Sequence, residues 1–302
     1  MNSAGNPPPS PQRCLIVGCG DVGRRVARRL LTDGMQVAGA VRSEGSAASL
    51  RELGADAWVV DLDVPETLAA LPTAGASVFY FAPPPTRGER DPRMAAFLAH
   101  CERHRPVRIV YISTSGVYGD CGGALVDEER PVAPRTDRAR RRLDAEEQLR
   151  TFMHDTGVPV MILRVGGIYG PGRLPVERLR RGGFSVICPD EAPYSNRIHS
   201  EDLARACIAA ATCGRAGGVY NAADGHATSM TDYFYRVADL YGLPRPPCVP
   251  LSEAQVLGDA MRSFIDESRR MDVTRLREEL GVQLAYPDLE AGLAASRTGD
   301  SG

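Results

Sequence analysis

The 302-residue sequence contains no lysine, and all 36 of its basic residues are arginine. Any chemistry that depends on a lysine amine is therefore excluded. The 38 acidic residues nearly balance the arginines and leave a net charge of −2. This balance does not indicate a partner that is a nucleic acid or a membrane surface.

Long hydrophobic runs and clustered metal ligands are also missing. No stretch approaches the ~20 apolar residues that a membrane-spanning helix needs. The eight cysteines form no Cys-x-x-Cys pair and have no zinc-like spacing, so we expect no metal. We interpret them as reduced thiols of a cytoplasmic protein, with Cys14 and Cys19 as small strand and loop residues rather than a redox pair. The 43% hydrophobic and 25% charged content is that of an ordinary globular chain.

The first half of the chain alternates between strand and helix patterns. Such apolar strands and intervening helices predict an α/β fold, a Rossmann-like, doubly wound parallel sheet with helices on both faces. Ligands bind such sheets at the carboxyl edge, so residues that follow a strand are the first site candidates. The expected strands are residues 14–18, 36–41, 56–60, 76–82, 107–113 and 158–164, and the expected helices are about 21–34, 45–54, 91–104 and 135–155.

After residue 164 the chain becomes richer in glycine and proline and loses this alternation. We therefore assign residues 13–165 to a nucleotide-binding domain and residues 166–294 to a smaller, mixed substrate-binding lobe. A strand near residues 219–221 could return to the main sheet. Residues 1–12, rich in Pro, Ser and Asn, and residues 295–302 are expected to form loose tails.

A glycine motif, GCGDVG, follows the first expected strand and opens a helix, which is the context that a dinucleotide-binding loop requires. Gly18 permits the tight turn, Gly20 lets a pyrophosphate approach the backbone, and Gly23 lets the helix pack closely. The helix start at Asp21 and Val22 offers unpaired N–H groups and a positive dipole end. We predict nucleotide binding here, with a glycine-rich turn without a ligand as the alternative.

The residue after the second strand indicates which nucleotide is bound. An acidic residue there would hold the ribose 2′-hydroxyl of NAD, whereas an arginine suits the 2′-phosphate of NADP. Arg42 occupies this place, so NADP is favoured over NAD, although Glu44 lies two residues further on. Asp61, after the third strand, is placed to reach the adenine edge; its alternative, compatible role is a cap for the helix that starts near residue 64.

Six motifs occur in a fixed order: LIVGCGDVGRRVARRL, YISTSGVYGD, LRVGGIYGPGR, NRIHSEDLA, VYNAADG and RLREELGVQLAYPDLEAGL. Together they resemble the NAD-dependent epimerase/dehydratase branch of the short-chain dehydrogenase/reductase superfamily, from about Leu15 to Leu293. The resemblance implies a domain that binds NAD(P) and a C-terminal lobe for a nucleotide sugar or a similar small molecule. Ala82 and Val165, at the ends of the fourth and sixth strands, join the expected cofactor contacts.

The catalytic motif of that family is incomplete here. Family members use a Ser or Thr after the fifth strand and a Tyr-x-x-x-Lys pair on the next helix. The hydroxyl position matches Thr114; alignment of the helix on Glu146 places Arg142 at the Lys position and Arg138 at the Tyr position. Arginine cannot exchange a proton as tyrosine does, but it supplies charge and donors. The sequence thus resembles an atypical member, in which Thr114 would orient the substrate and Arg142 would hold the nicotinamide ribose.

Several residues of the second lobe and of nearby loops are weaker candidates. Arg173 and Arg197 could bind a phosphate or carboxylate of the substrate, with surface arginines as an equally supported reading. His199 could act as a base, but a structural role beside a helix start fits it better. Tyr118 and Tyr169 could donate a relocated proton, although the family implies structural roles for both.

The helix that would start after His199 has two further candidates for its first turn. Ser200 and Asp202 are interpreted as capping residues.

The segment RTDRARRRL, residues 135–143, contains five arginines and raises the question of a polyanion partner. Acidic residues interleave with the arginines, and no aromatic residue is present for base stacking. We therefore expect a solvated helix with internal ion pairs, whose inward face carries Arg138 and Arg142. The expected i,i+4 pairs are Arg140–Asp144, Arg142–Glu146 and Glu146–Arg150; the expected inward apolar residues are Ala145, Leu149 and Phe152.

Two functions of different classes remain open. The first is an NADP-preferring oxidoreductase or epimerase-like enzyme with rearranged catalytic residues and a small-molecule substrate. The second is a non-catalytic NADP sensor or scaffold. Either would be a monomer or a homodimer.

Overall fold

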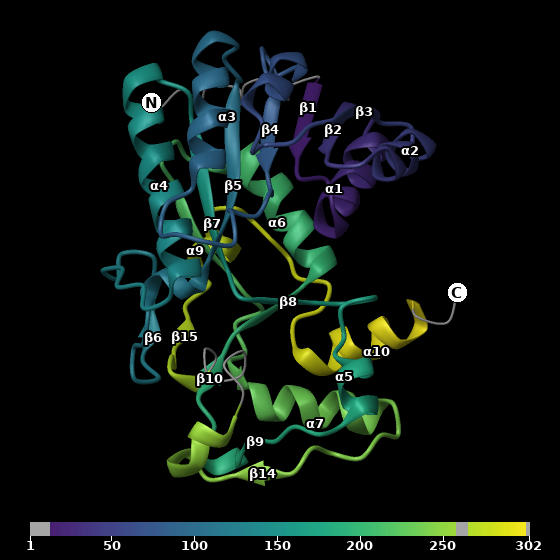
Figure 1. Cartoon of the computed structure of the whole chain (residues 1–302), viewed down its shortest axis with the longest axis vertical. Coiled ribbons are helices and arrows are strands. Elements are labelled where there is room, and N and C mark those ends of the chain that lie inside the picture. Colours follow the sequence, from purple (N-terminus) through teal and green to yellow (C-terminus); the bar gives the residue numbers. More distant parts are fainter. Residues whose placement is uncertain (1–12, 258–264, 300–302) are drawn as a thin grey trace, which may run out of the picture.

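The computed structural model describes residues 13–257 and 265–299 (Figure 1). Its centre is a seven-stranded sheet in the order β12-β7-β5-β4-β1-β2-β3, with every neighbouring pair parallel. This confirms the predicted Rossmann-like α/β fold. The strands are β1 (Arg13–Val17), β2 (Gln36–Val41), β3 (Asp56–Val59), β4 (Ser77–Tyr80), β5 (Arg108–Thr114), β7 (Val160–Val165) and β12 (Val219–Ala222).

Helices cover both faces of the sheet because successive strand side chains point to opposite sides. Ile16 and Phe79 pack with α1, α2 and α6, whereas Val17 and Tyr80 pack with α3 and α4. Both faces are therefore dry, which explains the near-continuous apolar strands of the sequence. These helices are α1 (Asp21–Thr32), α2 (Glu44–Glu52), α3 (Pro92–Arg103), α4 (Asp137–Thr156) and α6 (Ser200–Cys213).

The direction of the chain through the sheet reverses between β1 and β4. From β1 the chain builds β2 and β3 on one side, and then crosses to β4 on the other. Val17 lies opposite both Ala40 of β2 and Tyr80 of β4, so the loops after these strands leave the sheet together. Such a switch point is where open parallel sheets bind ligands.

The C-terminal part of the chain forms a smaller lobe below the sheet (Figure 1). It has its own apolar core, in which Tyr169, Phe234 and Leu293 are buried. The shorter elements of the chain are β6 (Leu125–Val126), β8 (Gly167–Tyr169), α5 (Val176–Arg181), β9 (Val186–Ile187), β10 (Tyr194–Ser195), β11 (Arg197–His199), β13 (Thr228–Ser229), α7 (Met230–Leu240), β14 (Cys248–Val249), β15 (Arg270–Met271), α9 (Thr274–Glu278) and α10 (Leu289–Gly299), with 3-10 turns η1 (Pro65–Ala70), η2 (Ser115–Tyr118), η3 (Pro189–Glu191) and η4 (Leu251–Val256).

The two expected tails have different outcomes. α10 continues to Gly299, so residues 295–299 are helical and their assignment to a loose tail was wrong. Leu289 and Leu293 pack this helix into the core of the lobe, which holds it in place. Residues 1–12 and 300–302 lie outside the described residues. Within the described parts of the chain, no helix combines the length and apolarity that crossing a bilayer requires.

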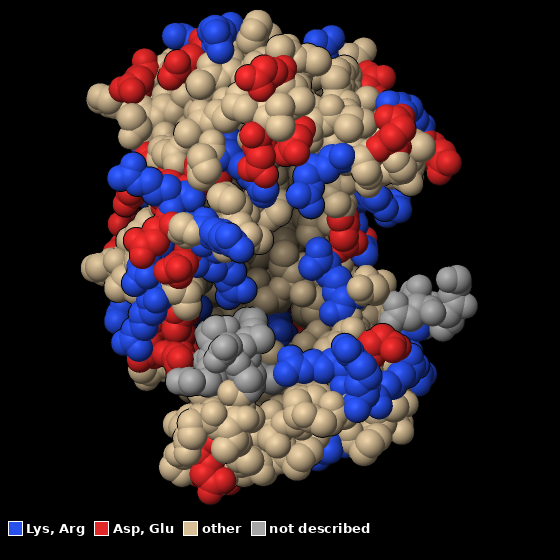
Figure 2. All heavy atoms as spheres, in the orientation of Figure 1, with Lys and Arg blue, Asp and Glu red and all other residues tan. Residues whose placement is uncertain are grey.

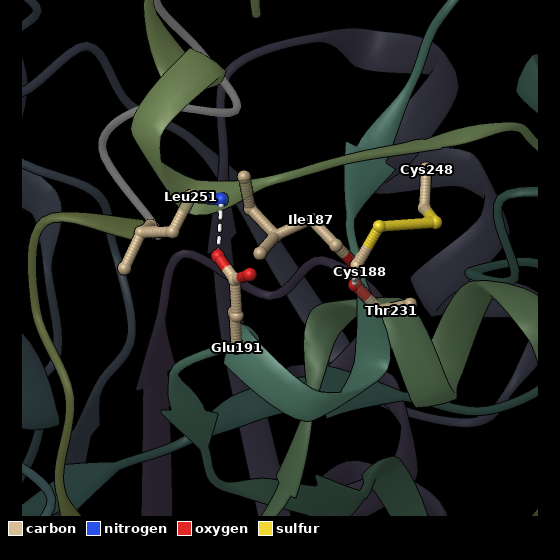
Figure 3. Close-up of a disulfide and its surroundings, with 6 residues drawn as sticks. All are labelled: Ile187, Cys188, Glu191, Thr231, Cys248 and Leu251. Carbon is tan, nitrogen blue, oxygen red and sulfur yellow. Dashed lines mark hydrogen bonds between the residues drawn. A yellow bond between two sulfur atoms is a disulfide. The ribbon is translucent and has the colours of Figure 1, made fainter.

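One pair of cysteines is not reduced, contrary to the interpretation of all eight as free thiols. Cys188, directly after β9, forms a disulfide with Cys248, the first residue of β14, with a Cα–Cα distance of 4.8 Å (Figure 3). The two strands pair in parallel, which brings together cysteines 60 positions apart in the sequence. No local spacing could have indicated this pair. Cys14 and Cys19 are free and buried, and burial raises the pKa of their thiols to about 11 and about 12.

Hydrogen bonds hold the chain on both sides of the disulfide. The Thr231 hydroxyl donates to the carbonyl of Ile187 at 2.6 Å, and the Glu191 carboxylate accepts from the N–H of Leu251 at 2.6 Å (Figure 3). The disulfide therefore belongs to a locally ordered region at the outer end of the lobe.

Removal of this disulfide is expected to destabilise the protein. A cross-link across a loop of this length is worth about 2–4 kcal/mol, because it restricts the unfolded chain. Cys248→Ser should lower the free energy of unfolding by that amount in urea titrations, and reductant should lower that of the wild type equally. Cys213→Ser, at an exposed free cysteine, is the control and should change little. Equal stability of the wild type with and without reductant would contradict the disulfide.

Candidate functional site

Two adjacent pockets lie at the carboxyl edge of the sheet, and Figure 2 shows the molecule hollowed between its two parts, with arginines at the rim. The glycine-loop pocket, about 570 Å³, is lined by residues 17–20, 40–43 and 60–62 with Arg24, Ser46, Ala82, Pro83 and Arg93. The arginine pocket, about 600 Å³, is lined by residues 83–86, 112–116, 165–168 and 194–197 with Arg138, Arg141, Arg142, Arg173, Met230, Glu267 and Arg269. Pro83 lines both pockets, so they adjoin at the sheet edge.

The glycine loop has the shape that a pyrophosphate needs. Gly18 has φ 84°, and a Cβ there would lie 2.5 Å from the backbone nitrogen of Ala82, so only glycine fits. A Cβ on Gly20 would meet nothing within 4 Å, which leaves its backbone open to a ligand. Gly20 is also the N-cap of α1 and provides no side-chain cap, so the first N–H groups of the helix remain available. These features fit a bound dinucleotide.

Three residues that were predicted to contact the cofactor, Asp21, Val22 and Gly23, do not line the pocket surface. Val22 is buried, and Gly23 allows close packing, since its Cβ would lie 3.1 Å from Cγ2 of Ile16. Asp21 pairs with Arg25 and Arg173. Burial alone would raise the pKa of Asp21, but the hydrogen bonds and charges of these arginines lower it. None of the three motif residues lines either pocket.

The residues after β2 give the glycine-loop pocket a positive and hydroxyl-rich end. Arg42 lines the pocket, and Ser43 caps α2 by accepting from the N–H of Ser46 at 3.3 Å. Glu44 forms an ion pair with Arg51 instead and does not line the pocket.

Asp61 lines the same pocket after β3. Its carboxylate accepts from the N–H of Asp63 at 3.0 Å, which closes a turn. The alternative role as a helix cap was wrong, because the N-cap of η1 is Val64 and no side chain caps it.

The three hydroxyl residues at the end of β5 and the start of η2 all line the arginine pocket, but the Ser113 hydroxyl bonds to a buried carboxylate. Ser113 is buried and donates to Glu146 at 2.6 Å. Thr114 lines the arginine pocket and also accepts from the N–H of Gly116 at 3.2 Å, which caps η2. Ser115 lines the pocket beside it. Thr114, as predicted from its motif position, is therefore available to a ligand.

The start of α4 turns arginines toward the pocket. Arg142 lies over β5, where its Nη1 donates to the carbonyl of Ile112 at 2.9 Å and to the Tyr111 hydroxyl at 3.2 Å. Arg141 is buried and donates to the carbonyl of Gly88. Arg138, one turn before Arg142, is exposed and lines the same pocket. The positions expected for Tyr and Lys thus present guanidinium groups.

Two of the three ion pairs predicted along α4 were wrong. Glu146–Arg150 forms at 2.9 Å, but Arg142 contacts β5, and Arg140 pairs with Asp137 and Glu89. The reason is that Glu146 is fully buried, not solvated. It accepts from Ser113 and also pairs with Arg164 of β7 at 2.9 Å. Although burial alone would lower the pKa of Arg164, its hydrogen bonds to Glu146 raise it.

His199 contacts neither pocket. It is the N-cap of α6, where its Nδ1 accepts from the N–H of Glu201 at 3.2 Å. Burial lowers its pKa, so the ring is neutral and structural. The interpretation of Ser200 and Asp202 as caps was wrong; Asp202 instead accepts from the N–H groups of residues 285 and 286.

Neither motif tyrosine reaches the arginine pocket. Tyr118 donates to Oδ1 of Asn221 at 2.7 Å, and Tyr169 donates to the carbonyl of Asp288 at 3.2 Å. Burial raises the pKa of both, that of Tyr118 to about 12. Both are therefore structural.

The arginine pocket contains two titratable groups that the sequence did not reveal. Glu267 is 8% exposed; one oxygen accepts from Arg269 at 2.8 Å, and Oε1 has no hydrogen-bond partner within the described residues. Tyr194, from β10, is half exposed to the pocket. Both come from irregular segments without a periodic or motif signal. In the part of the chain that is described, no cluster of His, Cys, Asp or Glu could hold a metal ion.

The fold and the glycine loop define a Rossmann-type dinucleotide-binding protein with an arginine-rich second pocket. The chain belongs to the NAD dependent epimerase/dehydratase family, whose sequence profile matches residues 14–223, which confirms the resemblance seen in its motifs. Protein YeeZ of Escherichia coli K12 is 28% identical over 292 residues, which cover 92% of this chain and 97% of that protein.

Solved structures agree with this assignment. A functionally unknown conserved protein from Silicibacter pomeroyi is 32% identical, with a TM-score of 0.79 over 96% of this chain and 100% of that one. The UDP-glucose 4-epimerase of Thermotoga maritima, solved with UDP-glucose, shares the fold at 19% identity, with a TM-score of 0.78 over 95% of this chain and 98% of that one.

The buried carboxylate of Glu146 should be essential for stability. Glu146→Ala would leave Arg164 charged and unpaired in the interior, which costs about 3–5 kcal/mol. The expected result is a loss of that size in the free energy of unfolding from urea titrations. Glu147→Ala, at the exposed neighbour on the same helix, is the control and should lose less than about 0.5 kcal/mol. If Glu146→Ala lost no more free energy of unfolding than Glu147→Ala, the buried pair of Glu146 and Arg164 would not contribute to stability.

Proposed function

We propose that this protein binds NADP and acts on a small anionic molecule, similar to a nucleotide sugar, at a carbonyl or hydroxyl group. The observation that carries this proposal is that the two pockets adjoin at the carboxyl edge of the sheet, where both are lined by Pro83. One pocket fits a dinucleotide. The other contains six arginines and one acidic residue, which favours phosphate or carboxylate groups on the substrate.

The cofactor would lie along the sheet edge. Gly18, Gly20 and the start of α1 would hold its pyrophosphate, with Asp61 and Ala82 on the adenine side. Thr114, Arg142 and Val165, which line the arginine pocket, would lie at the nicotinamide end. When bound, NADP supplies hydride transfer.

Selectivity for NADP follows from the charges around the ribose site. Arg42 and Arg24 line the glycine-loop pocket, and Ser43 and Ser46 provide hydroxyl donors. The acidic residue that follows β2, Glu44, is held by Arg51 and does not line the pocket. A 2′-phosphate thus meets positive charge, and no carboxylate of β2 or α2 competes for a 2′-hydroxyl.

Proton transfer needs a group other than the missing Tyr-x-x-x-Lys pair. Arg142 cannot serve because a guanidinium keeps its proton. In this proposal Glu267 takes or gives the proton, since the residue lines the substrate pocket and its Oε1 has no hydrogen-bond partner within the described residues. Arg269 positions it through the other oxygen. Thr114 and Ser115 would orient the reacting oxygen.

A non-catalytic NADP sensor is the second candidate. The observation that favours it is the engagement of Arg142 with Ile112 and Tyr111, which holds this guanidinium on the strand. In a sensor, the arginine pocket would bind an anionic ligand without changing it.

Replacement of Arg42 should reverse the nucleotide preference. Binding that is specific to the folded state raises the melting temperature, so NADPH should stabilise the wild type more than NADH does. Arg42→Asp should abolish the NADPH effect and favour NADH, because a carboxylate repels the 2′-phosphate and binds the 2′-hydroxyl. Arg28→Asp, at an exposed arginine of α1 outside both pockets, is the control. An unchanged preference in Arg42→Asp would contradict this assignment, and no shift with either nucleotide would contradict cofactor binding.

Loss of the Glu267 carboxylate should stop turnover without affecting cofactor binding. General acid–base catalysis contributes roughly 10²–10⁴-fold, so Glu267→Gln should lower kcat by about that factor. The measurement is conversion of a panel of UDP- and dTDP-linked sugars, followed by mass spectrometry, with stabilisation by NADPH recorded in parallel. Glu177→Gln, at an exposed ion-paired glutamate of the same lobe, should retain full activity. Full activity in Glu267→Gln would exclude this role, and no turnover by the wild type would favour the sensor.

A further inference from the structure

Arg197, at the start of β11, is one of two strongly buried arginines of the arginine pocket that form no ion pair within the described residues; the other, Arg141, donates to the carbonyl of Gly88. Arg197 is 6% exposed, yet no carboxylate of the described residues forms an ion pair with it. Arg164, at 3% exposure, pairs with Glu146. Arg269, which lines the same pocket, pairs with Glu267. A buried guanidinium without a counter-ion is costly, so its place in the pocket wall needs an explanation.

The contacts of Arg197 are weak for a charged group. Its Nη2 reaches the sulfur of Met230 at 2.8 Å and the Ser195 hydroxyl only at 3.5 Å. The Nε has no hydrogen-bond partner, and the guanidinium lies 3.7 Å from the ring centroid of Tyr233. Stacking on the ring fixes the orientation of the planar group but does not neutralise it.

The charges of two carboxylates, Asp224 and Asp232, act on Arg197, but neither forms an ion pair with it. Asp232 binds Arg236 through both oxygens, at 2.9 and 2.8 Å. Asp224 accepts from the N–H of His226 at 2.8 Å, and burial raises the pKa of its carboxyl to about 6. Burial likewise lowers the pKa of Arg197. The two carboxylates therefore offset the charge of Arg197 only in part and through space, without a hydrogen bond to its guanidinium.

The pocket leaves room for a ligand beside the guanidinium. A Cβ on Gly167 would lie 2.9 Å from Nη1 of Arg197, so the glycine keeps this nitrogen uncovered. Nη1 donates to none of the described residues. Both residues, together with Ser195, line the arginine pocket.

We propose that Arg197, with Ser195 beside it, forms an oxyanion subsite that binds one carboxylate or phosphate group of the substrate. The proposal rests on the proposed function in that the arginine pocket is the substrate site. The planar guanidinium, fixed on Tyr233, offers parallel N–H donors to two oxygens of one group. Arg197 anchors a part of the substrate away from Thr114 and does not take part in the chemical step. Its loss therefore raises KM more than it lowers kcat.

The test uses the full chain saturated with NADPH, so that added anions do not compete for the glycine-loop pocket. Thermal unfolding is followed against increasing inorganic phosphate in one series and malonate in another, at ionic strength held constant with sodium chloride. The wild type should show a saturable rise in melting temperature with at least one anion. The series that gives the lower half-saturation concentration distinguishes a phosphate from a carboxylate subsite.

Two variants with matched chemistry decide the outcome. Arg197→Met should raise the half-saturation concentration at least tenfold, and without anion it should melt no lower than the wild type, because an unpaired buried charge has been removed. Arg178→Met is the control: this arginine also stacks on an aromatic ring, 4.4 Å from Phe184, but lies outside the pocket. It should retain the anion response.

The proposal is overturned if Arg197→Met keeps the wild-type anion response, or if the wild type shows none. Should Arg197→Met fail to fold, Arg197→Lys keeps the charge and removes the paired donors. An unchanged half-saturation concentration in Arg197→Lys would then refute the subsite, and a weakened response would support it. Stabilisation by NADPH in the same samples tests cofactor binding separately, so failure of the subsite is distinguishable from failure of the proposed function.

Discussion

The buried carboxylate of Glu146 joins the three elements that form the floor of the arginine pocket. It accepts from Ser113 of β5 and pairs with Arg164 of β7, while its own helix, α4, lies across both strands. Since a buried charge is stable only when its partners are fixed, this contact determines where α4 begins relative to the ends of the strands. The guanidinium groups of Arg138 and Arg142 reach the pocket because of that placement.

The same contact explains what the chain does with the positions that its family uses for Tyr and Lys. A tyrosine and a lysine would act there through proton exchange and a lowered pKa. Two arginines keep a permanent positive charge, so α4 can bind anions but cannot transfer protons. In the proposed function the titratable group comes from another part of the chain, where Glu267 lies in a segment bonded to the loop after η2. Ser268 bonds to Asp120 and Cys121 of that loop, which fixes the segment.

The sequence predicted those features that depend on local pattern. The strand and helix periodicities predicted the sheet. The glycines predicted the loop, because Gly18 adopts a positive φ that favours glycine and Gly20 leaves the backbone open to a ligand. Thr114 and Arg142 were located by alignment of two short segments with the motifs of the family. Features that depend on tertiary contact could not be predicted. The Cys188–Cys248 disulfide joins two segments that are far apart in the sequence. Glu267 likewise lines a pocket with residues that are distant in the sequence.

The α4 ion pairs failed for a related reason. Charge spacing along a helix indicates which side chains can meet, but not which face of the helix is buried. Glu146 lies on the buried face and therefore contacts Ser113 of β5 and Arg164 of β7. Burial also separates two arginines that look alike in the sequence. Arg164 has a carboxylate partner and stabilises the fold, whereas Arg197 is nearly as buried and has none. A buried charge without an ion pair lowers the stability of the folded chain, and in the proposed subsite a bound anion would offset this loss.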